Sequence, residues 1–209
     1  MTSKGPEIDA LVERQGRVLK IVLAINAVMF FVEAGAGLLA RSAALLADSL
    51  DMLGDALVYG FSLYVVARGA RWKAGSALVK GLVQLAFGLA VLGVTLHKVL
   101  YPVIPVAEAI GAIGVVALVA NAACAWLLLR HRNDDVNMHS VWLCSRNDVI
   151  SNIAVILAGG LVAVTSSHWP DVTVGALIAL LFLRTSVGVV RRSVVELKHA
   201  ARQGNPQGA

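Results

Sequence analysis

Three aspartates stand inside the apolar stretch from Ala43 to Phe61, and they are the first residues whose type and spacing suggest chemistry: Asp48, Asp51 and Asp55. An ionisable side chain costs several kcal/mol near the centre of a bilayer, so a carboxylate in such a stretch is a candidate functional group. On a helix, Asp51 and Asp55 lie one turn apart on one face, and Asp48 is nearly in line with them. Because three neighbouring carboxylates repel one another, the pattern predicts a bound cation, bound protons or basic partners.

A structural role is the alternative for these aspartates, as a helix cap or as one half of a salt bridge. For Asp48 the two interpretations stay equally open. For Asp51 and Asp55 the functional one is favoured, because a single cap does not need two carboxylates one turn apart. No Lys or Arg lies nearby in the sequence to neutralise that face.

A second pair of candidate ligands, Cys144 and Asp148, has the same four-residue spacing in a later apolar run. Two helices that each offer such a pair can place four donors around one point, and four donors suit the tetrahedral geometry of zinc. A thiolate favours zinc or cadmium, whereas three carboxylates also leave cobalt, iron and manganese open. The alternative for Cys144 is a small buried apolar residue, which is the usual role of a free cysteine.

Composition indicates a membrane protein, because 58% of the 209 residues are hydrophobic and only 15% are charged. Soluble domains average about 45–50% apolar and about 25% charged residues. The net charge of +5 follows from basic loops and does not indicate nucleic-acid binding. Two cysteines are too few for a disulfide framework.

Six apolar runs are long enough to cross a bilayer, which needs about 20 residues for each helix. They predict an all-α integral membrane protein with six transmembrane helices. Lys and Arg gather before the first run, after the second, after the fourth and after the sixth, which places both termini in the cytoplasm. The very short link at Arg41-Ser42 predicts an antiparallel hairpin of the first two helices. The runs are approximately Val18–Ala40, Ala43–Ala67, Ala77–Leu96, Val106–Leu129, His139–Thr165 and Val172–Val190.

The expected organisation is one transport domain with short ends. Residues 1–16 form a polar cytoplasmic segment, residues 17–192 form the six-helix domain, and residues 193–209 form a short cytoplasmic tail that we expect to be disordered. The first apolar run is too long for a cleavable signal peptide. The expected location is a bacterial inner (plasma) membrane, crossed several times.

The residues from Ser42 through Asp55, together with Cys144-x-x-x-Asp148, resemble the cation diffusion facilitators, also called cation efflux transporters. The resemblance covers about residues 15–195. In that family the second and fifth helices each carry (His or Asp)-x-x-x-Asp, so the resemblance implies that Asp51, Asp55, Cys144 and Asp148 are the metal ligands. Asp48 matches a family aspartate just before the site and is a possible accessory ligand.

The resemblance implies an efflux transporter for a divalent metal, not an enzyme. Zinc is the first expected substrate, cadmium the second, with cobalt, iron and manganese open, and protons are the counter-ion in an alternating-access antiport. Typical members continue into a cytoplasmic domain that dimerises, and no such domain follows in this sequence, so a homodimer is expected to form through the helices in the lipid bilayer. Cys144 departs from the usual histidine. The alternative is a metal-binding membrane sensor, or an accessory subunit that does not transport alone.

Overall fold

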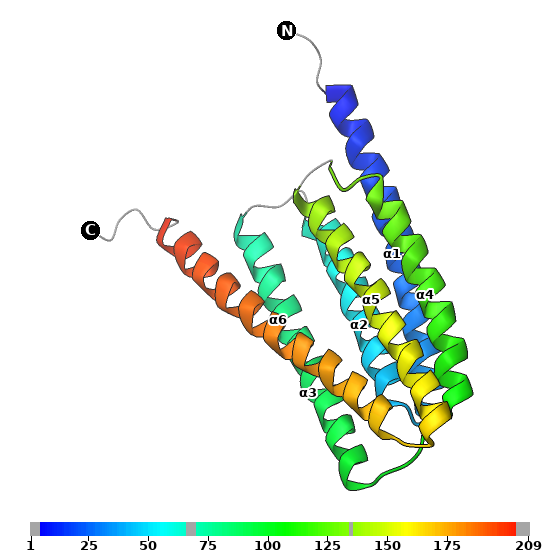
Figure 1. Ribbon diagram of the computed structural model, residues 1–209. Helices are drawn as coiled ribbons and strands as arrows, with labels where there is room; N and C mark the ends of the chain where they lie inside the picture. Colours follow the sequence, from blue (N-terminus) through cyan, green and yellow to red (C-terminus); the bar gives the residue numbers. More distant parts are fainter. Residues whose placement is uncertain (1–4, 66–69, 134–135, 204–209) are drawn as a thin grey trace.

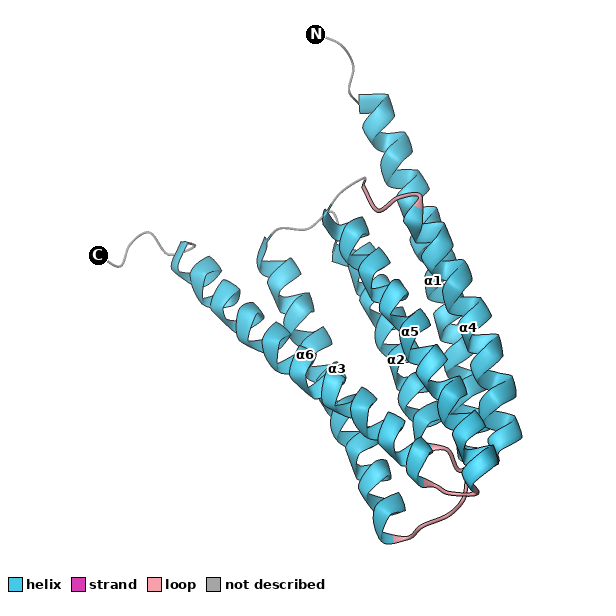
Figure 2. Cartoon of the chain, in the orientation of Figure 1, coloured by secondary structure: helices cyan, strands magenta, loops and turns pink. Residues whose placement is uncertain are grey.

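The computed structural model describes residues 5–65, 70–133 and 136–203, and all regular secondary structure in these ranges is helical (Figure 2). This confirms the predicted all-α fold with six helices. The helices are α1 (Gly5–Ala40), α2 (Ala43–Val65), α3 (Ala70–Leu100), α4 (Ala107–Leu129), α5 (Val136–Thr165) and α6 (Trp169–Gln203).

Most of these helices can cross a bilayer by length and composition alone. Within the described residues, α1, α3, α4, α5 and α6 each contain a span that is long and apolar enough. Helix α2 is not among these apolar spans and carries three aspartates. Its 23 residues nevertheless give a length of about 34 Å, which exceeds the hydrocarbon core of about 30 Å. Large apolar side chains such as Leu39 and Val164 are more than four-fifths exposed, as expected for surfaces that face lipid.

The helices pack as three pairs: α1 with α2, α4 with α5, and α3 with α6. The first two pairs form one body, and α3 and α6 lie against its α2 and α5 side. Figure 1 shows the α3 and α6 pair leaning away from that body towards the end where α1 begins and α6 finishes. We refer to this as the terminal end and to the opposite end as the far end.

A tight turn at the far end confirms the predicted hairpin of the first two helices. Helix α1 ends at Ala40 and α2 begins at Ala43. Arg41 adopts a left-handed backbone conformation with φ of 52°, which lets the chain reverse within two residues. The Ser42 hydroxyl then accepts a hydrogen bond from the Leu45 N–H at 3.1 Å, and so caps the start of α2.

A buried ion pair ties three helices together at the same end. The Asp171 carboxylate, at the start of α6, is fully buried and accepts hydrogen bonds from the Ser42 hydroxyl at 2.5 Å and from the backbone N–H groups of Ala43 at 2.7 Å and Ala44 at 3.1 Å. Lys98, near the end of α3, lies 3.0 Å from Asp171 and also donates to the Arg41 carbonyl. This carboxylate satisfies the free donors at the start of α2 and holds that helix in place.

Both end helices are longer than the sequence analysis expected. Helix α1 begins at Gly5, inside the segment expected to precede the first span. Helix α6 continues to Gln203, so the expectation of a disordered tail is wrong for residues 193–203. That stretch is rich in good helix formers and has no glycine or proline before Gly204. Residues 204–209 lie outside the described part of the chain.

Candidate metal centre

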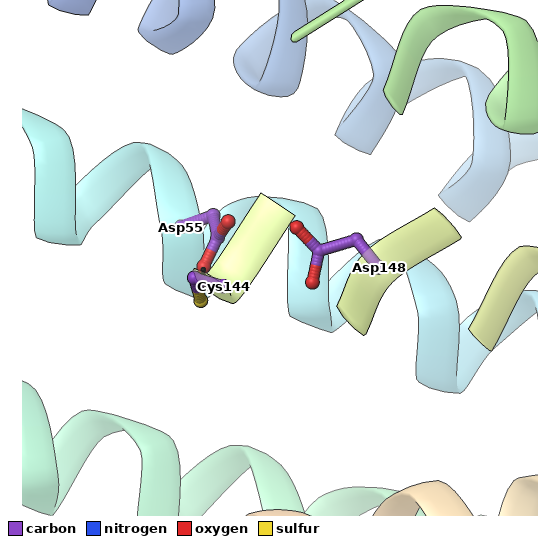
Figure 3. A group of neighbouring side chains, drawn as sticks. All are labelled: Asp55, Cys144 and Asp148. Atoms are coloured by element: carbon purple, nitrogen blue, oxygen red, sulfur yellow. Dashed lines mark hydrogen bonds between the residues drawn. The ribbon is translucent and has the colours of Figure 1, made fainter. Parts of the chain in front are cut away.

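Three of the predicted ligands meet between α2 and α5. One oxygen each of Asp55 and Asp148 and the sulfur of Cys144 all lie within 4.8 Å of one another. Figure 3 shows Asp55 facing Cys144, with Asp148 on the next turn of α5. Zn–O and Zn–S bonds of about 2.0–2.3 Å place two ligands of one ion at most about 4.5 Å apart. The three donors are therefore close to the spacing that a single ion requires.

Asp55 is the best-fixed member of this group, because both of its oxygens accept a hydrogen bond. The Tyr59 hydroxyl donates to Oδ2 at 2.7 Å, and the Cys144 thiol donates to Oδ1 at 3.2 Å. Tyr59 is fully buried and lies four residues after Asp55, on the same face of α2. Tyr59 thus fixes the carboxylate so that Oδ1 faces the Cys144 thiol of α5.

The other two aspartates of α2 have different surroundings. Asp51 is half-buried and lies within electrostatic reach of Asp55 and Asp48. It is outside the group of three close donors. Asp48 is buried, and its Oδ2 accepts a hydrogen bond from the Asn152 side chain at 2.6 Å. Asp48 is thus held towards α5 by an amide, away from the three donors.

A cavity of about 250 Å³ gives access to the donors from between four helices. Asp51, Asp55 and Cys144 line it, and the rest of its wall is largely apolar. On α2 the lining runs from Leu50 to Phe61, so the cavity extends from the donors towards the terminal end. Its polar lining from the other two helices consists of Lys80 and Gln84 of α3 and Thr185 of α6.

The far side of the centre is closed by close packing. An apolar cluster joins all six helices on the far-end side of the centre, with Leu45, Ile110 and Val155 fully buried in it. Gly175 of α6 lies so near Ala43 that a Cβ placed there would be 3.0 Å from the Ala43 Cβ. The donors are therefore reached from one end of the bundle and shielded from the other.

The chemistry that this donor set could support is reversible binding of a divalent cation. A metal ligand must be deprotonated, so an ion that binds here displaces the thiol proton now held between Cys144 and Asp55. Two carboxylates and a thiolate, with Asp51 one turn away on α2, provide a mixed oxygen and sulfur donor set. That set suits zinc and cadmium better than magnesium or calcium.

Sequence reasoning missed two groups that shape this region. Tyr59 could have been found, because the four-residue spacing that links Asp51 to Asp55 also links Asp55 to Tyr59. The Asn121 side chain of α4 donates to Asn152 at 2.8 Å, and so orients the amide that holds Asp48. No local spacing predicts that contact, because the two asparagines are 31 residues apart and meet only when α4 packs on α5.

Comparison with known proteins identifies a family that matches this chain. The family described as the cation efflux transmembrane domain matches residues 19–198. The cadmium, cobalt and zinc/H(+)-K(+) antiporter of Bacillus subtilis (strain 168) is 23% identical over 206 residues, which cover 90% of this chain and 65% of that protein. The zinc transporter ZitB of Yersinia pestis is 24% identical over 198 residues, which cover 88% of this chain and 64% of that protein.

A third relative is the metal cation efflux system protein CzcD of Cupriavidus metallidurans. It is 25% identical over 211 residues, covering 90% of this chain and 66% of that protein. The chain thus spans about two thirds of the length of these relatives. The family match covers α2 to α5 in full, most of α1 and α6, and all the candidate ligands. The resemblance inferred from the two spaced pairs is confirmed, and the chain belongs to the cation efflux family of multi-pass membrane proteins.

Proposed function

We propose that the protein carries zinc out of the cytoplasm in exchange for protons, with cadmium as a second substrate. The observation that carries this proposal is the group formed by Asp55, Cys144 and Asp148, whose donor atoms gather within 4.8 Å at the inner end of a cavity. Asp51 completes the proposed ligand set by turning from the cavity wall towards the ion. The names of the relatives, which include zinc, cadmium, cobalt and H(+), support the same class of substrate.

The state of the ligands supports proton exchange. The Cys144 thiol donates to Asp55, so a proton occupies the position that the metal would take. A zinc ion that enters must release this proton, and a proton that returns must release the zinc. Binding of one ion therefore opposes binding of the other, which is the requirement for an antiporter with a single shared site.

The arrangement of the helices supports alternating access. The cavity extends towards the terminal end, while packing and the Lys98–Asp171 pair close the far end. With the termini in the cytoplasm, as the distribution of basic residues predicts, this is a state that loads from the cytoplasm. We propose that the α3 and α6 pair rocks against the other four helices to expose the centre on the far side. A homodimer formed through the helices is part of this proposal.

Flux through proteoliposomes tests the proposal. Vesicles that hold a zinc-sensitive dye and a pH-sensitive dye are diluted into zinc, and we expect zinc to enter while protons leave. Asp55→Asn should abolish both signals. Glu13→Gln, a change at an exposed residue of α1, should leave both unchanged.

Two results would contradict the proposal. Equal flux through Asp55→Asn would remove the centre from the transport path. Tight zinc binding by the wild-type protein without any flux would favour the alternative, a membrane sensor or accessory subunit.

A further inference from the structure

A lysine stands inside a membrane span and on the wall of the cavity that leads to the metal centre. Lys80 of α3 is half-buried and belongs to the apolar span Leu78–Leu100. It lines the same cavity as Asp51 and Asp55, and among the described residues of that lining it is the only basic one. Charged residues within membrane spans are rare, and those that face a cavity often mark the path of an ion. The role of Lys80 is therefore to be sought in the cavity.

The side of α3 that carries Lys80 is fixed by close contacts with α6. Gly81 and Gly88 lie seven residues apart on one side of α3, and a Cβ added to either would meet a side-chain atom of α6 at 2.9 Å. Lys80 lies on the neighbouring side, together with Gln84 and Phe87, because helix positions four and seven residues apart share a face. The two glycine contacts therefore hold α3 in a rotation that places Lys80 on the cavity wall.

Lys80 lies at the outer end of this cavity. The inner end is formed by Phe87 of α3, Phe182 of α6 and Leu50 of α2, which all pack into the apolar cluster on the far-end side of the centre. Lys80 precedes Phe87 by seven residues, which places it about 10 Å closer to the terminal end, where α3 begins. Asp51 directly follows Leu50, at the inner end. A cation that enters from the terminal end therefore passes Lys80 before it reaches the donors.

We propose that the positive charge of Lys80 lowers the affinity of the centre for divalent cations and thereby sets the zinc concentration at which the protein loads. The carboxylates of α2 attract a cation, whereas the ammonium group of α3 on the same cavity repels it. This repulsion reaches the centre without direct contact, because protein and lipid around a cavity screen charges less than water does. The inference rests on the proposed zinc transport, and it adds a residue that adjusts the affinity without binding the ion.

The effect of Lys80 differs between the empty and the loaded centre. In the empty centre, its ammonium group supplies a positive charge to a cavity that otherwise holds the carboxyl groups of Asp51 and Asp55. In the loaded centre, the ammonium and the divalent ion share one cavity and repel each other. A protonated lysine has no lone pair to offer, so it cannot compensate as a ligand. Lys80 therefore stabilises the empty centre relative to the loaded one, which keeps binding weak enough for release.

A series of variants with different charges at one position tests the inference. Isothermal titration of zinc into the purified full chain compares each variant with the wild type. Lys80→Gln should lower the Kd for zinc by about 10-fold, and Lys80→Glu should lower it further. Lys80→Arg keeps the charge and should match the wild type. Lys20→Gln makes the same chemical change at an exposed lysine of α1, which contributes no described residue to the cavity lining, and should also match.

Two further measurements separate an effect of charge from an effect of shape or of direct ligation. In Lys80→Gln the Kd for cadmium should fall by the same factor as the Kd for zinc, because both ions carry two charges. In proteoliposomes the same variant should reach half-maximal flux at a lower zinc concentration, while its maximal flux should not rise. If Lys80→Gln does not fold, Lys80→Met is measured instead, since methionine keeps a long side chain without the charge.

The inference is overturned if Lys80→Gln binds zinc no more tightly than the wild type. It is also overturned if Lys80→Arg and Lys80→Gln change the Kd equally, because the charge would then not be the cause. If the wild type binds no zinc at all, the proposed function fails and this inference fails with it. Zinc binding by the wild type with an unchanged Kd in Lys80→Gln contradicts this inference alone. The two failures are therefore distinguishable.

Discussion

Replacing Tyr59 by phenylalanine removes a single hydroxyl that donates to the metal centre. The Tyr59 hydroxyl lies 2.7 Å from Asp55 Oδ2, and the ring is fully buried, so phenylalanine fills almost the same space. The change leaves the ligands themselves in place. It isolates the effect of holding Asp55 in position.

The expected size of the effect comes from the kind of bond that is lost. A hydrogen bond to a charged group contributes about 1.5–3 kcal/mol, which corresponds to roughly 10–150-fold in an equilibrium constant. Loss of an outer partner of a metal ligand typically lowers metal affinity by about 10–100-fold. We therefore expect Tyr59→Phe to raise the Kd for zinc by about 10–100-fold.

Isothermal titration of zinc into the purified protein measures this change. Tyr101→Phe is the matched control, because Tyr101 is 65% exposed near the end of α3, and its Kd should equal that of the wild type. Asp55→Asn sets the lower limit of zinc affinity, since it removes a proposed ligand. If Tyr59→Phe binds zinc as tightly as the wild type while Asp55→Asn does not bind, then positioning of Asp55 by Tyr59 is refuted.

Three further experiments test the packing and the cavity. Lys98→Met removes one partner of a buried ion pair, so it should lower the free energy of unfolding by about 3–5 kcal/mol. The unfolding temperature seen by circular dichroism should fall accordingly, whereas Arg17→Gln, at an exposed ion pair, should change that temperature little. Gly159→Ala places a Cβ 3.1 Å from a backbone nitrogen of α4 and should destabilise the contact between α4 and α5 by about 1–3 kcal/mol. In the control, Gly160→Ala, the added Cβ meets no atom within 4 Å, so the same thermal scan should show no loss of stability. A small thiol reagent should label Cys144, which lines the cavity, and zinc should block that labelling as followed by mass spectrometry.

Each of these three experiments has a result that would contradict its prediction. Equal loss of stability in the Lys98 and Arg17 variants would mean that burial of the far-end pair does not matter. Equal stability of the two glycine variants would mean that the helices can separate at no cost. Labelling that zinc does not affect would place the thiol outside the metal centre.

Contacts within a helix were predictable from the sequence, because they depend only on spacing. The six helices, the hairpin at Arg41-Ser42 and the pairing of Cys144 with Asp148 on one face all follow from apolar length and the four-residue repeat. The approach of Asp55 to Cys144 was predicted from the idea that two such pairs converge, and the structure brings these two residues together.

Contacts between helices were harder to predict from the sequence, because they depend on which helix faces pack against each other. The Lys98–Asp171 pair joins residues 73 positions apart at the far end, and nothing in either local sequence marks the partner. The position of Asp48 could not be predicted for the same reason, since its orientation is decided by Asn152 of α5 and, through it, by Asn121 of α4. The end of α6 differs from the expected disordered tail because residues 193–203 contain no glycine or proline and favour a helix.

X-ray absorption at the zinc edge tests most directly the claim that the metal binds between α2 and α5. For the zinc-loaded wild type we predict one Zn–S bond at about 2.3 Å and three Zn–O bonds at about 2.0–2.2 Å. In Cys144→Ser the sulfur contribution should vanish while the oxygen ligands remain. A wild-type spectrum without sulfur, or a sulfur contribution that survives in Cys144→Ser, would contradict the proposed centre.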